Sequence, residues 1–283
     1  MDLVELQIFK TVAEQGGITR AATALHRVQS NVTTRVKQLE ERLGIKLFHR
    51  QGRRLVLSSE GKLLLSYAER LLRLSTEAQA AVKGHAPHGI FRLGSLESTA
   101  ATRLPPLLAA YHRTHPGVRL ELVTDTSGAL VDQVLRGELE AAFVAEPFPA
   151  KNLETQHAFT EELVLITPRS HGRVGTPKAL EQRVVLAFPT GCSYRRRLES
   201  WLGRSSVVAE RVMEYGSYHA MTACVAAGGG IAVVPRSVLH VVGAENQVAV
   251  HALPAQISKA RTMLVWPRGH QSAALSALRD ELR

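Results

Sequence analysis

The sequence predicts an α/β protein with a small helical domain, a long connecting helix and a larger domain of alternating strands and helices. Three observations predict this class. Hydrophobic residues make up 45% of the 283 residues, which is an ordinary globular composition. The first 58 residues show three short helical patterns followed by two short strands. From residue 90 onward, apolar strand-like runs alternate with helical segments.

The first 58 residues predict a winged helix-turn-helix. Apolar residues at helical spacing indicate a first helix over 3–13, which the glycines at 16–17 end. A second short helix over 19–25 carries the small residues that close helix packing requires. A third helix begins at residue 29 and ends at Gly44, with one apolar face formed by Val32, Val36, Leu39 and Leu43. Two short strands over 46–57 then form a hairpin, the wing.

Positive charge is concentrated on this domain, which indicates a polyanionic partner. The chain has 35 Lys and Arg against 25 Asp and Glu, a formal charge of +10, and within residues 27–54 only Glu40 and Glu41 oppose the cations. A solvated basic face is the alternative. A helix with short polar groups at its N-terminal end and cations beside them suits the major groove of double-stranded promoter DNA. The predicted DNA-binding residues are Gln29, Ser30, Asn31 and Thr33 for base choice, Thr34 beside them, and Arg35, Lys37, Arg50, Arg53 and Arg54 for phosphates.

Residues 59–89 predict a dimerisation helix and a hinge. Ser58 is a plausible N-cap for a helix running to about Val82. A seam at heptad spacing follows, formed by Leu64, Tyr67, Leu71, Leu74, Ala78 and Ala81. Packing of this seam on the chain's own domain is the alternative. A two-fold dimer would present two reading helices to successive turns of DNA.

The N-terminal motifs closely resemble the winged helix-turn-helix of LysR-type transcriptional regulators. The resemblance rests on Ala21-Ala22, Leu25, Gln29, Val32-Thr33, Leu39-Glu40, Leu43-Gly44, Leu47-Phe48, Arg50 and Leu57-Ser58-Ser59-Glu60-Gly61. Val28 stands where the family often has Ser or Thr, and Ser30 where it often has Pro. The resemblance implies a sequence-specific DNA-binding regulator that assembles as a homodimer and then a homotetramer. It also implies that residues 90–283 form a regulatory domain that binds a small-molecule effector.

Residues 90–283 contain the segments that such an effector domain needs. Strands are predicted at 91–95, 119–123, 140–144, 163–167, 184–187, 207–212, 231–234, 248–250 and 262–266. Helices are predicted at 100–115, 128–136, 194–202, 218–227 and 270–282. The resemblance implies two α/β subdomains like those of periplasmic solute-binding proteins, with the chain crossing between them near residues 144–146 and 264–266.

In such a fold a ligand binds beyond the carboxyl ends of strands, at the starts of helices. The predicted effector-binding residues are Ser95, Glu97, Ser98, Thr99, Asp125, Thr126, Glu146, Ser193, Tyr194, Arg195, Tyr218 and His219. Ordinary helix capping is the alternative for each Ser or Thr. The hydroxyls and Arg195 favour a carboxylate effector, whereas the acidic residues, with tyrosines as cation–π partners, favour a cation or diamine.

Several of these segments also resemble LysR-type regulators linked to putrescine utilisation. They are 94–101, 192–196, 217–219, 227–232 and 235–237. This resemblance implies a role in polyamine or related amino-acid catabolism.

Other classes of function find less support in the sequence. It has no GxSxG, HExxH, P-loop or GxGxxG motif, so neither an enzyme nor a cofactor is expected. Two cysteines and unpaired histidines predict no metal site. The start has no export signal, and no apolar run is long enough for a membrane span, so we expect a cytoplasmic protein without a membrane partner. A solute-binding module and an architectural DNA-binding protein are the remaining alternatives.

Overall fold

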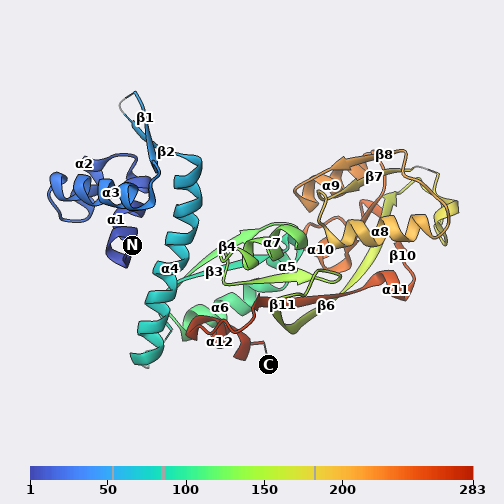
Figure 1. Ribbon diagram of the computed structural model, residues 1–283. Coiled ribbons are helices and arrows are strands. Elements are labelled where there is room, and N and C mark those ends of the chain that lie inside the picture. The colour runs from blue at the N-terminus through green and yellow to red at the C-terminus, as the bar shows by residue number, and fades with distance from the viewer. Residues whose placement is uncertain (53, 84–86, 182, 283) are drawn as a thin grey trace. The chain divides into compact units, whose positions relative to one another are not determined.

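The computed structural model describes residues 1–52, 54–83, 87–181 and 183–282, which fold into two compact units. The N-terminal unit is Met1–His85 and the C-terminal unit is Ala86–Arg283 (Figure 1). Arg53, one of the predicted DNA contacts, and residues 84–86 of the predicted hinge lie outside the described residues.

The N-terminal unit is a winged helix-turn-helix followed by a long helix, as the sequence predicts. Its elements are α1 (Leu3–Gln15), α2 (Ile18–Ala24), α3 (Gln29–Leu43), β1 (Phe48–Gln51), β2 (Arg54–Leu57) and α4 (Ser59–Lys83). Asp2 caps α1, and Gly16 and Gly44 end α1 and α3 in the left-handed conformation. Val28 offers no side-chain cap, yet α3 begins at Gln29.

Small residues let the three short helices pack closely. Ala21 and Ala22 of α2 are buried in one core with Phe9 of α1 and with Val32 and Leu39 of α3. The apolar face of α3 therefore points inward, and its opposite face is left for other contacts.

The first turn of α4 is fixed to the wing. Ser58 caps the helix by accepting the Gly61 N–H at 2.8 Å, and its own hydroxyl donates to the Lys46 carbonyl at 2.7 Å. A Cβ on Gly61 would lie 2.2 Å from the Leu47 carbonyl oxygen, so only glycine permits this close approach.

The C-terminal unit consists of two α/β lobes. Lobe A, residues 87–161 and 259–282, contains β3 (Gly89–Ser95), α5 (Glu97–Thr102), α6 (Leu104–Thr114), β4 (Val118–Thr124), α7 (Ser127–Leu135), β5 (Ala141–Ala145), β11 (Lys259–Pro267) and α12 (Ala273–Asp280). Lobe B, residues 163–258, contains β7 (Val184–Ala187), α8 (Ser193–Gly203), β8 (Arg211–Glu214), α9 (Tyr218–Ala226), β9 (Ala232–Pro235), α10 (Arg236–Val241), β10 (Val248–Ala252) and α11 (Ala255–Ser258). A long strand, β6 (Leu153–Pro168), belongs to both lobes (Figure 1).

Strand pairing builds one sheet in each lobe. In lobe A the order is β4-β3-β5-β11-β6, in which β3 pairs in parallel with β4 and β5. In lobe B the second half of β6 pairs with β9 and β10, and a parallel bridge from Val185 to Ile231 joins the β7-β8 pair to it. The carboxyl ends of β3, β4 and β5 therefore lie at one edge of the lobe A sheet, where ligands bind in open α/β folds.

The lobes are connected where β6 and β11 run side by side. β6 pairs with β11 up to Glu162 and with β9 from Leu163, and the chain returns to lobe A at Lys259, the partner of Glu162. The crossings therefore lie near residues 162 and 258, and the expectation of residues 144–146 and 264–266 is wrong. The physical reason is that β5 and the first half of β6 belong to the lobe A sheet before the chain leaves it, and that all of β11 joins this sheet after the chain returns.

A buried carboxylate joins the lobes beside these crossings. Glu161, on β6, is 3% exposed. It accepts hydrogen bonds from Arg103 of lobe A, whose Nε lies 2.6 Å from Oε1, and from Ser237 of lobe B, whose Oγ lies 2.8 Å from Oε2. The contact is charge-assisted and ties α10 to the α5–α6 turn.

Other predicted boundaries in this unit are close, with local differences. The helix expected over 100–115 is divided into α5 and α6 at Arg103, with Pro105 and Pro106 in the first turn of α6. The strand expected over 207–212 begins only at Arg211. The first half of β6, together with α10, was not predicted.

Candidate nucleic-acid interface and ligand pocket

The outer face of α3 is polar and exposed. Val32, Val36, Leu39 and Glu40 are buried on the inner face, which leaves the predicted residues Gln29, Ser30, Asn31, Thr34 and Lys37 exposed. Thr33 is half-buried, and its hydroxyl donates to the Gln29 carbonyl at 2.9 Å. Gln38 shares the exposed face, although the sequence analysis did not single it out. Short polar groups at the start of the helix, with Lys37 one or two turns later, form a surface that can read base edges.

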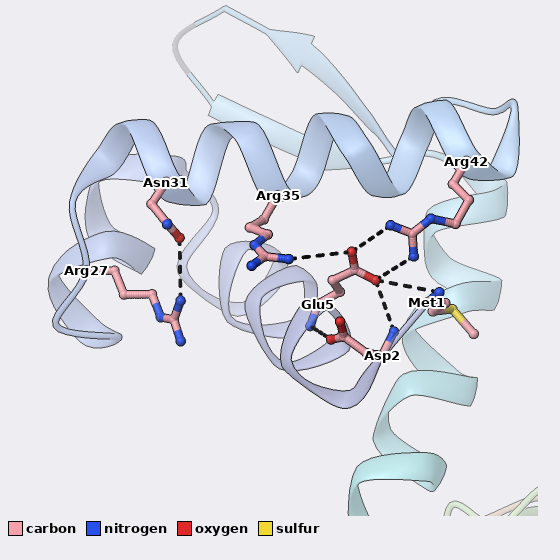
Figure 2. Close-up of polar contacts among 7 residues, drawn as sticks. All are labelled: Met1, Asp2, Glu5, Arg27, Asn31, Arg35 and Arg42. Atoms are coloured by element: carbon pink, nitrogen blue, oxygen red, sulfur yellow. Dashed lines mark hydrogen bonds and ion pairs between the residues drawn. The ribbon is translucent and has the colours of Figure 1, made fainter.

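Arg35 is half-buried at the border between the exposed and the buried face of α3, one turn after Asn31. Figure 2 shows Arg35 and Arg42 reaching from α3 toward Glu5 of α1. Arg42 donates from both terminal nitrogens to Glu5, each at 2.9 Å, and the nearest Arg35 nitrogen is 4.0 Å from Oε1. Further along the same side, the Arg27 guanidinium donates to Asn31 at 3.5 Å. These contacts fix the side chains that border the reading face.

Glu5 connects the start of α1 to the end of α3. Its side chain is buried and accepts the Asp2 N–H at 3.0 Å, and Asp2 in return accepts the Glu5 N–H at 2.8 Å, a capping box. Hydrogen bonds from Arg42 lower the pKa of Glu5 to about 2, although burial acts in the opposite direction. The ion pair therefore sets the position of α3 on α1.

Replacing Glu5 with glutamine is expected to destabilise the N-terminal unit by about 2 kcal/mol near pH 7, because Arg42 loses its buried partner while remaining half-exposed. The pKa of Glu5 is lowered by folding, so its contribution is complete above about pH 4.5 and disappears as the pH falls toward about 2. Urea unfolding of both proteins near pH 7 and near pH 3 measures this, and the difference should narrow in acid. Glu14→Gln, on the exposed face of α1, is the matched control and should cost under about 0.5 kcal/mol. Equal effects of the two substitutions would refute the role of Glu5.

The wing is held by a second buried carboxylate. Glu40 accepts the backbone N–H groups of Leu47 and Phe48 at 2.9 and 3.3 Å and the Lys46 ammonium at 2.8 Å. Burial opposes ionisation, but these hydrogen bonds outweigh it and lower the pKa of Glu40. Lys46 is thereby engaged, while Arg50 and Arg54 are exposed on the two strands of the hairpin. Both remain available for phosphates.

An apolar stripe runs along α4. Leu63, Tyr67, Leu71 and Leu74 are exposed at helical spacing, and Leu63 and Leu74 are 61% and 59% exposed. We call these four residues the α4 stripe. Leu64, a member of the predicted seam, instead packs against the core of its own unit with Leu65 and Leu72. Leu63 takes its place, because the helix turns Leu64 toward α1. The side chain of Ala81 lies outside the described residues.

A pocket lies between the two lobes of the C-terminal unit, with about 290 Å³ of non-atom space that includes open solvent. The turn after β3, the turn after β4 and the starts of α8 and α9 all contribute to it. Seven of the predicted residues line it, namely Glu97, Ser98, Asp125, Thr126, Ser193, Tyr194 and Tyr218. Ser127, Phe188 and Cys192 also line it and were not predicted as ligand contacts.

Five predicted effector residues lie outside this lining. The Ser95 hydroxyl donates to the Leu96 carbonyl, and Thr99 is buried one residue beyond the lining. The Glu146 carboxylate is directed to Arg261, at 3.8 Å, and His219 is exposed. Arg195 borders only a neighbouring apolar compartment, because Glu199 and Glu214 hold its guanidinium. Proximity in sequence to a strand end was therefore not sufficient to place a side chain in the pocket.

The walls of the pocket are joined across the lobes. The Ser193 hydroxyl of lobe B donates to the Ala145 carbonyl of lobe A at 2.7 Å, and the Gly128 N–H of lobe A donates to the Gly191 carbonyl of lobe B at 3.2 Å. The Glu97 carboxylate also lies close to the Tyr218 backbone N–H across the same boundary. A ligand in this pocket therefore contacts both lobes, which makes its binding sensitive to their arrangement.

Metal clusters and membrane-spanning helices are both absent from the described part of the chain. No group of three or more His, Cys, Asp or Glu residues is placed to hold a metal ion among the described residues. Among the same residues, none of the helices combines the length and apolar character that a membrane crossing requires.

A winged helix-turn-helix with an exposed reading face, joined to a two-lobed domain with an inter-lobe pocket, defines a ligand-responsive DNA-binding regulator. Residues 3–62 match the model of the bacterial regulatory helix-turn-helix protein, lysR family, and residues 84–283 match the LysR substrate binding domain. The chain belongs to the LysR family of transcriptional regulators. Members of this family are non-enzymatic, DNA-binding transcription factors that carry an effector-binding domain.

Individual relatives agree with this assignment. The chain is 41% identical to the uncharacterized HTH-type transcriptional regulator YusT of Bacillus subtilis over 94% of this chain and 89% of YusT. It is 38% identical to the regulator GltR of Bacillus subtilis over 94% of this chain and 90% of GltR. Full-length CbnR solved with its target DNA has a TM-score of 0.69 at 23% identity, covering 100% of this chain and 99% of CbnR. At that identity the structural match supports the fold alone.

Proposed function

We propose that the chain binds a promoter operator as a homodimer that pairs into a homotetramer, with one α3 entering the major groove from each subunit. The observation that carries this proposal is the division of α3 into a buried apolar face and an exposed polar face. Gln29, Ser30, Asn31 and Thr33 choose the bases, Thr34 lies beside them, and Lys37, Arg50 and Arg54 contact phosphates. Arg35 also contacts a phosphate if its guanidinium turns away from Glu5. The cytoplasm, where promoter DNA is accessible, is the proposed location.

The α4 stripe is the surface on which we propose that dimers form. Four exposed apolar side chains on one helix cost free energy in water, and a two-fold partner would cover them with its own copy of the same stripe. Assembly of dimers into tetramers rests on the resemblance to LysR-type regulators.

The pocket between the lobes is the proposed effector site. An effector that prefers one arrangement of the lobes changes the geometry of the oligomer, and with it the spacing of the reading helices and the bend of the DNA. The proposed pathway is polyamine or related amino-acid catabolism. Support for the pathway comes from the resemblance of segments 94–101, 192–196 and 217–219 to regulators linked to putrescine utilisation.

The division of labour on the DNA surface can be tested with Gln29→Ala and Arg54→Ala. Gln29→Ala should weaken binding to the operator roughly tenfold and leave binding to random DNA nearly unchanged, because a base-edge contact is lost. Arg54→Ala should weaken both by similar factors and lower the salt slope by about 1, because a phosphate contact is lost. Fluorescence anisotropy at several salt concentrations measures the affinities and the salt slope, with the intergenic DNA next to the chain's own gene as the operator and with random DNA.

Arg113→Ala, an exposed arginine of the C-terminal unit, is the control for nonspecific charge loss and should match the wild type. If Gln29→Ala loses equal affinity on both DNAs, Gln29 does not choose bases, and the assignment of α3 as the reading helix is contradicted.

A further inference from the structure

The charged residues that line the inter-lobe pocket are all acidic. Glu97 and Asp125 line it, and the lining contains no Lys, Arg or His. The guanidinium of Arg195, which starts from the same turn as the lining residues, is already held by Glu199 at 2.8 Å and Glu214 at 2.7 Å. Among the residues that line the pocket, the negative charge therefore has no cation to balance it.

Several polar atoms in the pocket also lack a partner. Glu97 Oε2, Ser98 Oγ and Tyr194 Oη are buried and have no partner with good hydrogen-bond geometry among the described residues, although the hydroxyls of Ser98 and Tyr194 lie close enough to interact. Ser98 and Tyr194 are only 2% and 3% exposed. Buried polar atoms are normally paired, so three such atoms around one cavity indicate a ligand that supplies hydrogen-bond donors.

A mostly apolar compartment adjoins this pocket, with about 230 Å³ of non-atom space that includes open solvent. It shares Phe188, Cys192, Tyr194 and Tyr218 with the pocket. Apolar residues that include Leu198 and Met221 complete it, together with Arg195, whose guanidinium is held by Glu199 and Glu214. The rings of Phe188 and Tyr218 lie 4.7 Å apart and form the shared wall. This compartment suits a hydrocarbon chain, and its aromatic wall also attracts a cation.

We propose that the effector is a small primary amine whose ammonium group is bound by Glu97, Ser98 and Tyr194 and whose carbon chain lies along the Phe188–Tyr218 wall. This inference rests on the proposed function, in which the pocket is the effector site. A primary ammonium has three donors and no acceptor, which matches a carboxylate oxygen and two hydroxyl oxygens. The ion pair with Glu97 would form away from water, where charge-assisted hydrogen bonds are strong.

A carboxylate effector fits the same pocket poorly. It would place a second anion against Glu97 in a partly buried site, and two like charges there raise each other's cost of ionisation. The starts of α8 and α9 offer N–H groups that attract an anion. Repulsion from the carboxylates of Glu97 and Asp125 opposes this attraction.

Binding of the amine should weaken in acid. Burial raises the pKa of the Glu97 carboxyl, while the Tyr218 N–H and His219 oppose the rise. The other titratable groups at the pocket are Asp125, Cys192, Tyr194 and Tyr218, and burial keeps the last three neutral by raising each pKa. As the pH falls through the raised pKa of Glu97, the carboxylate is neutralised and its attraction for ammonium is lost.

Calorimetry on the full-length protein tests the proposal with four small molecules that have the same number of carbon atoms. The probes are butylamine, 1,4-diaminobutane, butyrate and succinate. Both amines should bind, more weakly near pH 5 than near pH 8, and the two acids should give no heat. Glu97→Gln should weaken amine binding at least tenfold, and Tyr194→Phe several-fold. Glu138→Gln, which removes a surface carboxylate paired with Arg136, should bind amines like the wild type.

The outcomes separate this inference from the proposed function. Tighter binding of either acid than of either amine, or equal amine binding by wild type and Glu97→Gln, would overturn the amine assignment. The comparison of amines with acids uses only the wild type, so it stands even if a variant fails to fold. Each preparation is also measured on the intergenic DNA without probes. Wild type that binds the DNA but no amine overturns the inference alone, and wild type that fails to bind the DNA overturns the proposed function.

Discussion

Replacing Leu74 with glutamate is expected to leave the chain monomeric and to lower its affinity for the operator by on the order of a hundredfold. The side chain is 59% exposed, so the fold of the subunit should not change. In a dimer formed through the α4 stripe, however, two buried charges would replace two leucines, at a cost of several kcal/mol. Loss of the dimer separates the two reading helices, so the second half-site is no longer bound at high effective concentration.

Sedimentation velocity gives the oligomeric state, and anisotropy with the intergenic DNA gives the affinity. Thr76→Glu is the matched control, because Thr76 is exposed on the opposite side of the same helix. It should remain dimeric and bind DNA like the wild type. A Leu74→Glu protein that still sediments as a dimer would show that the stripe is not the contact between subunits.

Replacing Gly61 with alanine is expected to destabilise the N-terminal unit by about 3 kcal/mol. DNA binding by the variant is expected to be lost near the urea concentration at which its N-terminal unit unfolds. The new methyl group would lie 2.2 Å from the Leu47 carbonyl oxygen and 2.9 Å from Leu57 Cδ2. The carbonyl cannot easily withdraw, because it accepts the Ser58 N–H at 2.9 Å and so holds the wing to α4. Urea unfolding followed by circular dichroism measures the loss.

Gly203, the last residue of α8, provides the control. A Cβ on Gly203 meets nothing within 4 Å, so Gly203→Ala should be neutral or slightly stabilising through its better helix propensity. If Gly61→Ala unfolds at the same urea concentration as the wild type, the close approach of α4 to the wing does not limit the sequence at that position.

Local patterns determine most of the N-terminal unit, which explains why the sequence predicted it well. The apolar spacing of α3, the glycines that end α1 and α3, and the Ser58 cap all act within a few residues. The choice between Leu63 and Leu64 depended instead on the direction in which α4 leaves the wing. Neighbouring leucines on a helix are about 100° apart, so periodicity alone did not decide which of them faced solvent.

Long-range pairing accounts for what the sequence analysis missed in the C-terminal unit. The first half of β6 is mostly polar and lacks the expected strand pattern, but pairing with β11 stabilises it. Glu161 finds Arg103 and Ser237 at separations of 58 and 76 residues, which no local motif reveals. The pocket lining followed strand ends for seven residues, while Glu146 and Arg195 were drawn away by ion pairs that only the tertiary structure defines.

The pairing of Glu162 with Lys259 places both inter-lobe crossings next to each other on two hydrogen-bonded strands. The hydrogen-bonded ladder fixes the register of this ribbon and so resists sliding of one lobe along the other. A change in the arrangement of the lobes is therefore expected to be a rotation about the ribbon. A ligand bound between the lobes would change the angle between them. A small change of angle at the two crossings becomes a large displacement at the far edges of the lobes.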